Sequence, residues 1–362
     1  TTLQRRHPPE VIRLMRTNFR ASLLPAVVCS TLATLALPAQ ALNILLCNDD
    51  GISAANLRAL KQQLQAAGHS TIVAAPIDNQ SGRGGYIAFL QPVPSLTGNE
   101  RSAKTLGLPA GTVGVGTDPT DPDVHYVNGT PVAACLYGID VKASEKWGTP
   151  PDLVISGPNE GNNTGHINAS SGTFNNLLYA INRGLPAMAI SDAATSQVNW
   201  APGLPPTSRA FEVADLVVRL LDEVLDAKPP RQRAERRPIR RLMPEGLGMN
   251  VNVPLFATGT GTSLRFAVTH VGVATAYGPA FYARLSDSPL AVASGVNYPL
   301  PGISLAPGGT VLPSGVVVPK DGDPRAEGNA VARGDVVTIS PVQGLPEASR
   351  QYELWLKSRL GR

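Results

Sequence analysis

Three short polar segments of this chain hold the residue types that bind hard metal ions. In 48–51, Asp49 and Asp50 stand side by side, and adjacent carboxylates repel each other unless a cation or proton neutralises them. The segments 78–82 and 156–163 add Ser and Asn side chains and several glycines. Such oxygen ligands suit Mg²⁺, Mn²⁺ or Ca²⁺, and none of the three segments contains His or Cys. An Asp-Asp-Gly sequence alone is more often a solvated turn that caps a helix, so the predicted cation site depends on all three segments meeting.

A fourth segment, 170–173, reads Ser-Ser-Gly-Thr and precedes a predicted helix. The free N–H groups at the start of a helix, together with these hydroxyls, suit a phosphate group. We call 170–173 the phosphate cradle. Oxygen ligands for a cation beside such a cradle are the equipment of metal-assisted phosphoryl hydrolysis.

The first two metal-binding segments must be positioned by the elements before them. Residues 43–47 are a short apolar run typical of a buried parallel strand, 54–67 carry leucines at helical spacing, and 70–76 read as a second strand. This is a βαβ unit of ordinary length. In an open α/β sheet, ligands bind at the carboxyl ends of strands, which is where 48–51 and 78–82 fall.

The strand–helix alternation continues as far as residue 225. The pattern predicts a helix from Pro131, strands at 152–155 and 186–191, and helices at 173–183 and 211–225. We therefore expect an α/β fold with a Rossmann-like, mostly parallel sheet sandwiched by helices.

The character of the sequence changes further along the chain. A strand-like segment lies at 250–254, and then 264–319 alternates short β-like runs with Gly/Pro turns, which indicates a β-hairpin-rich, antiparallel C-terminal extension. A strand at 336–340 and a helix around 348–360 follow. We divide the chain into an N-terminal segment with a signal peptide, an α/β core, the extension, and a returning strand and helix. The bounds are 1–41, 42–254, 255–330 and 331–362.

The N-terminal segment is typical of an export signal. It carries five arginines and one glutamate, an almost wholly apolar run at 21–37, and the small-x-small sequence 39–41. We expect cleavage after Ala41 and a periplasmic or secreted protein. An uncleaved membrane anchor is the alternative, because the run is nearly long enough to span a bilayer.

The remainder of the chain is formally neutral, since the net charge of +4 resides in residues 1–41. A neutral protein has no general attraction for a nucleic-acid duplex, and we expect no stable membrane insertion after cleavage. The arginines at 228–241 are interrupted by prolines and are interpreted as a solvated loop. Cys29 would leave with the signal. Cys47 and Cys135 lie in apolar surroundings and are interpreted as small buried hydrophobic residues.

At these segments the sequence resembles the SurE family of survival-protein nucleotidases and acid phosphatases. The resemblance runs in order through ILLCNDDG (44–51), VAAPIDNQSG (73–82), VNGTPVAACLYGI (127–139), PDLVISGPNEGNN (151–163) and SSGT (170–173). Weaker similarity follows at 184–191, 249–254 and 331–341. Together these segments span most of the chain after residue 41.

The resemblance implies a ligand set and an activity. The metal-binding positions of the family fall on Asp49, Asp50, Ser81 and Asn159, with Mg²⁺ or Mn²⁺ as the expected cation. Asp49 and Asp50 are the expected catalytic residues. Expected to contact the phosphate are Asn48, Asn163, Ser171, Gly172 and Thr173. The implied reaction is release of phosphate from nucleoside 5′- or 3′-monophosphates and other esters, by a homodimer or homotetramer with a Rossmann-like core.

This chain departs from the family at two places. The family commonly has Tyr before SGT, where Ser170 stands here, and often Glu-Gly in the next helix, where Tyr179 and Ala180 stand. A smaller residue beside the cradle predicts a wider pocket and a broad substrate range. The export signal resembles that of the secreted acid-phosphatase branch.

Two other functions use some of the same residues. An exported binding protein would capture a phosphorylated ligand in the cradle without turnover, and a metal-activated hydrolysis assay separates it from an enzyme. A glycoside hydrolase also uses paired carboxylates, but these must lie about 5 Å or more apart across the substrate, which adjacent Asp49 and Asp50 do not suit. The sequence leaves open whether an aspartate acts as base or nucleophile or a metal activates water.

Overall fold

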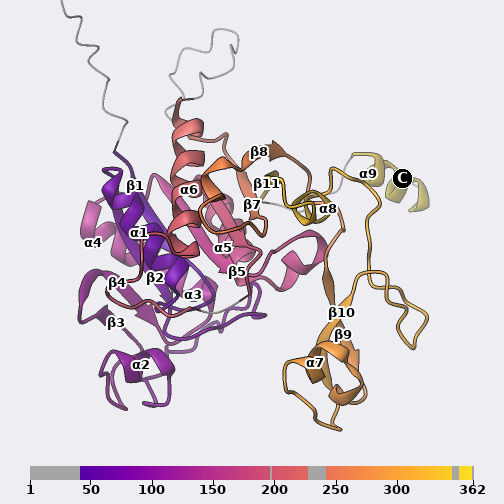
Figure 1. Cartoon of the computed structure of the whole chain (residues 1–362), viewed down its shortest axis with the longest axis horizontal. Coiled ribbons are helices and arrows are strands. Elements are labelled where there is room, and N and C mark those ends of the chain that lie inside the picture. The colour runs from indigo at the N-terminus through magenta and orange to yellow at the C-terminus, as the bar shows by residue number, and fades with distance from the viewer. Residues whose placement is uncertain (1–40, 196–197, 227–241, 345–349, 361–362) are drawn as a thin grey trace, which may run out of the picture. The chain divides into compact units, whose positions relative to one another are not determined.

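The computed structural model describes residues 41–195, 198–226, 242–344 and 350–360 (Figure 1). The predicted signal peptide up to residue 40 and the arginine-rich segment 228–241 lie outside these ranges, so both interpretations stay predictions. Within the same ranges, no helix combines the length and the apolar character needed to cross a bilayer.

A nine-stranded sheet forms the centre of the described chain (Figure 1). In spatial order its strands are β3 (Val115–Asp118), β4 (Asp121–Val127), β2 (Ser70–Pro76), β1 (Asn43–Cys47), β5 (Leu153–Glu160), β6 (Ala187–Asp192), β7 (Leu247–Val253), β11 (Val336–Gln343) and β8 (Arg265–Val268). From β4 to β7 the strands run parallel, whereas β3 is antiparallel to β4 and β11 to β7. The predicted mostly parallel sheet is therefore confirmed.

The order of the strands reverses at β1. From β1 the chain passes through β2 toward one edge, and it later returns to add β5, β6 and β7 on the other side of β1. Open α/β sheets bind ligands at such a reversal, outside the carboxyl ends of the strands. Asp49 and Asp50 follow the end of β1 directly and so stand at this position.

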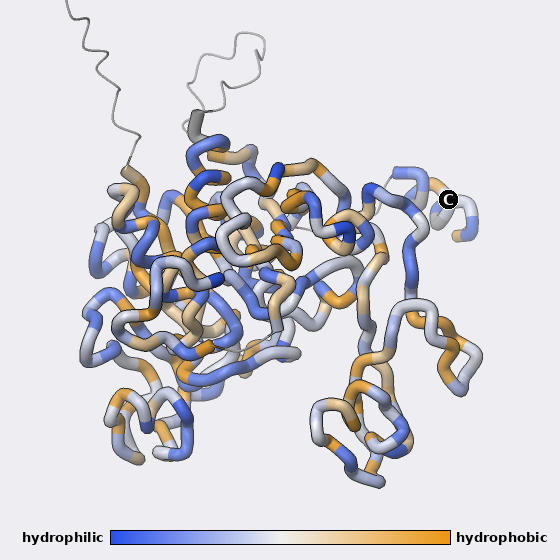
Figure 2. The backbone as a smooth tube through the Cα atoms, viewed as in Figure 1, coloured by the Kyte–Doolittle hydropathy of each residue, from blue (hydrophilic) through white to orange (hydrophobic). Residues whose placement is uncertain are grey.

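Helices cover both faces of the sheet because alternate side chains of a strand point to opposite faces. Ile44 and Leu46 pack in one core with α1 (Ala55–Ala66) and α6 (Arg209–Asp226). Leu45 lies in a second core with α3 (Pro131–Tyr137) and α5 (Gly172–Asn182). Along α6, hydrophobic and hydrophilic residues alternate in the tube of Figure 2, as expected for a helix with one buried face.

The extension contributes to two separate sheets. β9 (Tyr277–Tyr282) and β10 (Gly302–Pro307) form an antiparallel hairpin. β8 instead joins the main sheet, parallel to β11. The other α-helices of the described ranges are α2 (Arg101–Thr105), α4 (Ala143–Trp147), α7 (Pro289–Ala293), α8 (Glu327–Ala332) and α9 (Arg350–Arg359).

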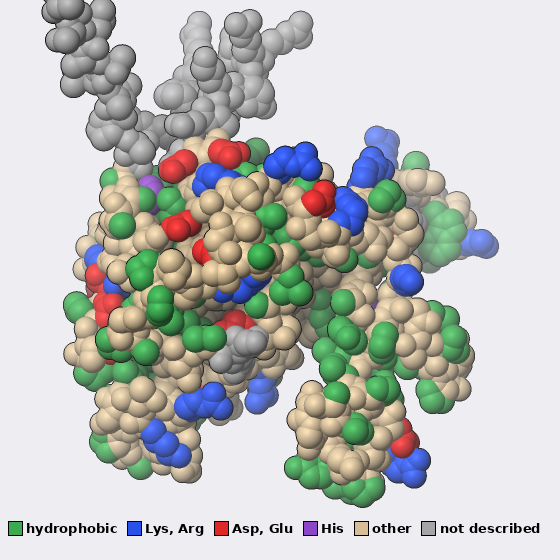
Figure 3. Space-filling model, in the orientation of Figure 1, with side chains coloured by type: hydrophobic (Ala, Val, Ile, Leu, Met, Phe, Trp, Pro, Cys, Tyr) green, Lys and Arg blue, Asp and Glu red, His purple; other side chains and the backbone are tan. Residues whose placement is uncertain are grey.

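The hairpin and the segment around α7 expose a large share of apolar surface (Figure 3). The exposed hydrophobic side chains here are Tyr277, Phe281, Val292, Tyr298, Leu300 and Ile303. Exposed large apolar side chains gathered on one segment are a feature of interaction sites.

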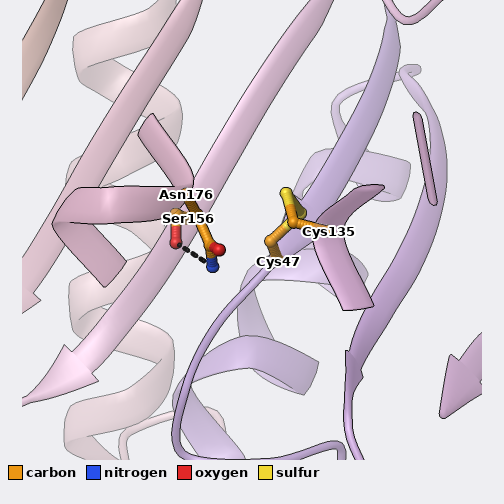
Figure 4. The surroundings of a disulfide bond; sticks show 4 residues. All are labelled: Cys47, Cys135, Ser156 and Asn176. Carbon is orange, nitrogen blue, oxygen red and sulfur yellow. Dashed lines mark hydrogen bonds between the residues drawn. A yellow bond between two sulfur atoms is a disulfide. The ribbon is translucent and has the colours of Figure 1, made fainter. Parts of the chain in front are cut away.

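Cys47 and Cys135 form a disulfide bond that joins the end of β1 to α3 (Figure 4). Both residues are buried, as predicted, but the interpretation as simple hydrophobic residues was wrong. The two cysteines are 88 positions apart in the sequence and give no local signal of the bond, because only the packing of α3 on β1 brings their Cα atoms to 5.4 Å. The bond fixes the end of β1, two residues before Asp49.

Candidate active site

Asp49 is almost fully buried against the start of α5. One carboxylate oxygen accepts a hydrogen bond from the Thr173 hydroxyl (2.6 Å), and the other accepts one from the Gly172 backbone N–H (3.1 Å). Burial raises the pKa of Asp49, and these hydrogen bonds partly offset the increase. The aspartate therefore lies at the positive end of the α5 dipole.

Position 172 has room only for glycine. A Cβ atom there would lie 2.6 Å from Cγ of Pro131 and 2.7 Å from Cβ of Asp49. The absence of a side chain lets the start of α5 approach both β1 and the start of α3. This close approach brings the cradle into contact with the first carboxylate.

Asp50 is held by the last residue of β5 and by the loop after β2. Its Oδ2 accepts a hydrogen bond from the Glu160 backbone N–H (3.0 Å), and its Oδ1 accepts one from the Asn79 side chain (3.3 Å). The pKa of Asp50 is raised well above its ordinary value, first by burial and then by the charges of Asp49 and Glu160. Two neighbouring carboxylates that both resist ionisation favour a bound cation or a retained proton.

The loop after β2 is tied to both aspartates. The Gln80 N–H donates to the Asp49 carbonyl (2.7 Å), and the Asn79 side chain, which contacts Asp50, also accepts from the Ser81 N–H (2.9 Å). Ser81 is exposed at this loop. The sequence-predicted ligand is thus connected to the aspartates through Asn79, a residue that the motif alone did not single out.

Asn159 lies within β5 and not in a loop after it. The strand extends five residues beyond its predicted end at 155, through an irregularity between Ser156 and Asn159 that includes a cis Gly157–Pro158 bond. The Asn159 side-chain NH₂ donates to the Gly161 carbonyl (2.6 Å), which fixes the direction of its amide oxygen.

Glu160 is a third acidic residue of this site, which the motif reading missed. Burial raises its pKa to about 7, with a further contribution from Asp192, and its Oε1 accepts from the Val198 N–H (3.1 Å). Its buried Oε2 has no hydrogen-bond partner in the described part of the chain. A carboxylate directly after Asn159 was the signal that could have revealed it.

The residues present fit a divalent cation. Two carboxylates that are largely buried and close together need a counter-charge, and the neighbouring Ser81 and Asn159 offer only oxygen or amide groups. No cluster of three or more His, Cys, Asp or Glu side chains suited to a metal occurs among the described residues, so such a cation would depend on neutral oxygen ligands too. That donor set suits a hard ion such as Mg²⁺ or Mn²⁺.

The expected phosphate-contacting residues fall into two groups. Asn48 holds the turn before Gly51, and the Asn163 side chain donates to Ser191 (3.0 Å), so both are occupied by the protein's own groups. Ser171 caps α5 by accepting from the Phe174 N–H. Gly172 and Thr173 contact Asp49, as described above.

Comparison with known proteins gives a family match, two relatives and one solved structure of similar fold. The family model described as "Survival protein SurE" matches residues 44–277. An acid phosphatase of Yarrowia lipolytica is 31% identical to this chain, and the match covers 59% of this chain and 56% of the phosphatase. A 5′-nucleotidase SurE of Methanopyrus kandleri is 33% identical, and the match covers 59% of this chain and 66% of the nucleotidase. This chain therefore spans less than two thirds of those relatives. The crystal structure of the SurE protein from Aquifex aeolicus has a TM-score of 0.57 at 22% identity, covers 87% of this chain and 98% of its own, and supports the fold.

Proposed function

This chain belongs to the SurE family, and we propose that it is a divalent-cation-dependent phosphomonoesterase that releases phosphate from nucleoside 5′- or 3′-monophosphates and from other esters. The observation that carries the proposal is the pair Asp49 and Asp50, largely buried with raised pKa values at the reversal of the sheet, against the start of α5. The names of the relatives, an acid phosphatase and 5′-nucleotidases, support this reaction class.

Each residue of the site has a defined part in this proposal. Asp49 and Asp50 would hold the cation, with Ser81 and Asn159 completing its ligands. Thr173 and Gly172 orient the Asp49 carboxylate, while Asn79 and the Glu160 N–H orient that of Asp50. A divalent cation supplies Lewis-acid activation of a phosphoryl oxygen. The positive end of α5 favours the phosphate dianion at the same place.

The test replaces one carboxylate oxygen by nitrogen. Asp49→Asn and Asp50→Asn should each lower kcat/KM on the order of 100-fold or more and weaken Mn²⁺ binding. Each substitution keeps the shape of the side chain but removes the negative charge that would bind the cation. The matched control is Asp140→Asn, which makes the same change at an exposed ion pair with Arg183. Hydrolysis is measured on a panel of nucleoside monophosphates and 4-nitrophenyl phosphate, with and without EDTA.

Two results would refute the proposal. Full, EDTA-insensitive activity of the Asp49 and Asp50 variants would remove the metal-binding role. Tight binding of nucleoside monophosphates by the natural protein with no release of phosphate in any metal would favour the binding-protein alternative.

The cradle supports a broad substrate range. The Ser170 carbonyl accepts from the Gly84 N–H (3.0 Å), which places this residue beside the loop after β2. Its short side chain turns back on its own segment, because the hydroxyl donates to the Ile167 carbonyl (3.0 Å). We expect comparable efficiency on several nucleotides and an aryl phosphate, and a narrower range for Ser170→Tyr. A preference of the natural protein for one nucleotide by more than about a thousandfold would contradict this, because one small apolar group discriminates only about 10–200-fold.

Export and assembly belong to the same proposal. The disulfide Cys47–Cys135 supports a periplasmic or secreted protein, because such bonds persist in oxidising compartments. N-terminal sequencing of fractionated protein should find Leu42 as the first residue. The exposed apolar side chains of the hairpin support a homodimer or homotetramer, which light scattering of the purified protein tests.

A further inference from the structure

A buried glutamate from the end of the chain holds the segment that leads into the phosphate cradle. Glu327, the first residue of α8, is fully buried. Its Oε1 accepts hydrogen bonds from the Gly165 N–H (3.1 Å) and from the Asn168 side-chain NH₂ (3.2 Å). Asn250 of β7 donates to both carboxylate oxygens (3.0 Å each), and the Ser340 hydroxyl of β11 adds a further bond.

Asn168 transmits this anchoring to the start of α5. Its backbone carbonyl accepts from the Ser171 N–H (3.3 Å) and from the Asn175 side chain (3.3 Å). Ser171 caps α5 and immediately precedes Gly172, which contacts Asp49. A continuous set of contacts therefore runs from Glu327 to the cradle and to the first carboxylate of the site.

The same glutamate also restrains the segment through Asn250. The Asn250 side chain donates to the Asn163 carbonyl (3.0 Å) while it donates to Glu327. Asn252 donates to that carbonyl as well (3.0 Å) and accepts from the Asn163 N–H (3.0 Å). Both ends of 163–168 are thus fastened to a single polar cluster.

This cluster is costly for the fold to maintain. Among the described residues, the groups that donate to Glu327 are all neutral and no Lys or Arg side chain pairs with it, and burial raises the pKa of Glu327 to about 7. In the part of the chain that the structure describes, the buried Oδ1 atoms of Asn168 and Asn250 have no hydrogen-bond partner. Buried groups of this kind are rare without a role, because an apolar core at the same place would be at least as stable.

We propose that Glu327 is a positioning residue for the phosphate-binding end of the site, acting through Asn168 to hold the start of α5 where an incoming phosphoryl group meets it. The inference rests on the proposed function, because it names a residue that holds the phosphate cradle of the proposed enzyme in place. Glu327 makes no hydrogen bond to the proposed metal ligands, so its effect reaches a bound phosphate through Asn168 and the cradle, and through Asn250 and the Asn163 carbonyl.

The experiment measures binding of inorganic phosphate by isothermal titration calorimetry at pH 8, where Glu327 is mainly a carboxylate. Glu327→Gln keeps the shape of the side chain, but its NH₂ group cannot accept the hydrogen bonds that the carboxylate accepts. The Kd for phosphate should therefore rise about tenfold or more, which is the effect of losing about one hydrogen bond to a charged group. KM for phosphate esters should rise with it, while kcat changes less than threefold. Asn168→Ala should weaken binding similarly, and the double variant should be no worse than Glu327→Gln alone.

The control is Val331→Ala, which removes buried apolar contacts from the same helix and leaves the polar cluster in place. It should lower Tm but not the affinity for phosphate. The proposal is overturned if Val331→Ala weakens phosphate binding as much as Glu327→Gln does, if the two cluster substitutions are additive, or if the natural protein does not bind phosphate. The titration needs no turnover. If the protein proved not to hydrolyse phosphate esters, the effect of Glu327→Gln on phosphate affinity could still be measured, so the two proposals can fail separately.

Discussion

Replacing Glu327 by Gln should change how the stability of the protein depends on pH. The pKa of Glu327 is about 7 in the folded chain against an ordinary value of 4.5, chiefly because burial disfavours the carboxylate. The folded state therefore retains this proton to higher pH than the unfolded state does. The associated stability is fully present below pH 4.5 and is lost as the pH rises to about 7.

The magnitude follows from the difference between the two pKa values. Each pKa unit corresponds to about 1.36 kcal/mol, so ionisation of Glu327 should cost the folded state about 3 kcal/mol above pH 7. Glu327→Gln has no such proton. The difference in free energy of unfolding between the variant and the natural protein should thus change by about 3 kcal/mol, in favour of the variant, from pH 4.5 to pH 8.5.

Urea denaturation at several pH values measures this difference. Subtracting the two curves cancels other groups with raised pKa values, such as Glu160 and Asp50, because both proteins contain them. Glu145→Gln makes the same change at an exposed pair with Lys142 and is the control against which the difference for Glu327→Gln is compared. A difference for Glu327→Gln that does not change between pH 4.5 and pH 8.5 would show that burial does not govern the pKa of this carboxyl.

Three further predictions concern the site and its supports. Replacing both Cys47 and Cys135 by Ala should lower the free energy of unfolding by about 4.6 kcal/mol, because the bond closes a loop between residues 88 positions apart; no change relative to the oxidised protein in urea titrations would contradict this. Without a cation, Asp50→Asn should raise Tm at pH 8, because it relieves repulsion between buried carboxylates, whereas added Mn²⁺ should raise Tm only for the natural protein; differential scanning fluorimetry decides both. Gly172→Ala should cost about 1–3 kcal/mol and reduce hydrolysis, since its Cβ would contact Pro131 and Asp49 too closely; a stable and fully active variant would show that α5 can move away.

The sequence alone predicted the elements that have a strong local period. The apolar runs at 43–47 and 70–76 specify β1 and β2, because a strand buried on both faces is apolar throughout. The leucines between them specify α1, because a helix buried on one face repeats its apolar residues every three or four positions. The position of Asp49 and Asp50 follows as well, since polar residues directly after a parallel strand must lie at the binding edge of the sheet. The family resemblance added the choice of Ser81 and Asn159.

Only the tertiary structure decided how distant segments meet. The disulfide of Cys47, the parallel pairing of β8 with β11 and the position of Asn159 inside an irregular β5 each depend on packing between parts of the chain that are far apart in sequence. Glu327 lies about 160 residues from Gly165 and Asn168, and nothing in its sequence surroundings distinguishes it from a solvated helix start. A hydrogen bond between such distant residues imposes no period on the sequence, so the support of the cradle became visible only once the folded chain had buried that carboxylate beside it.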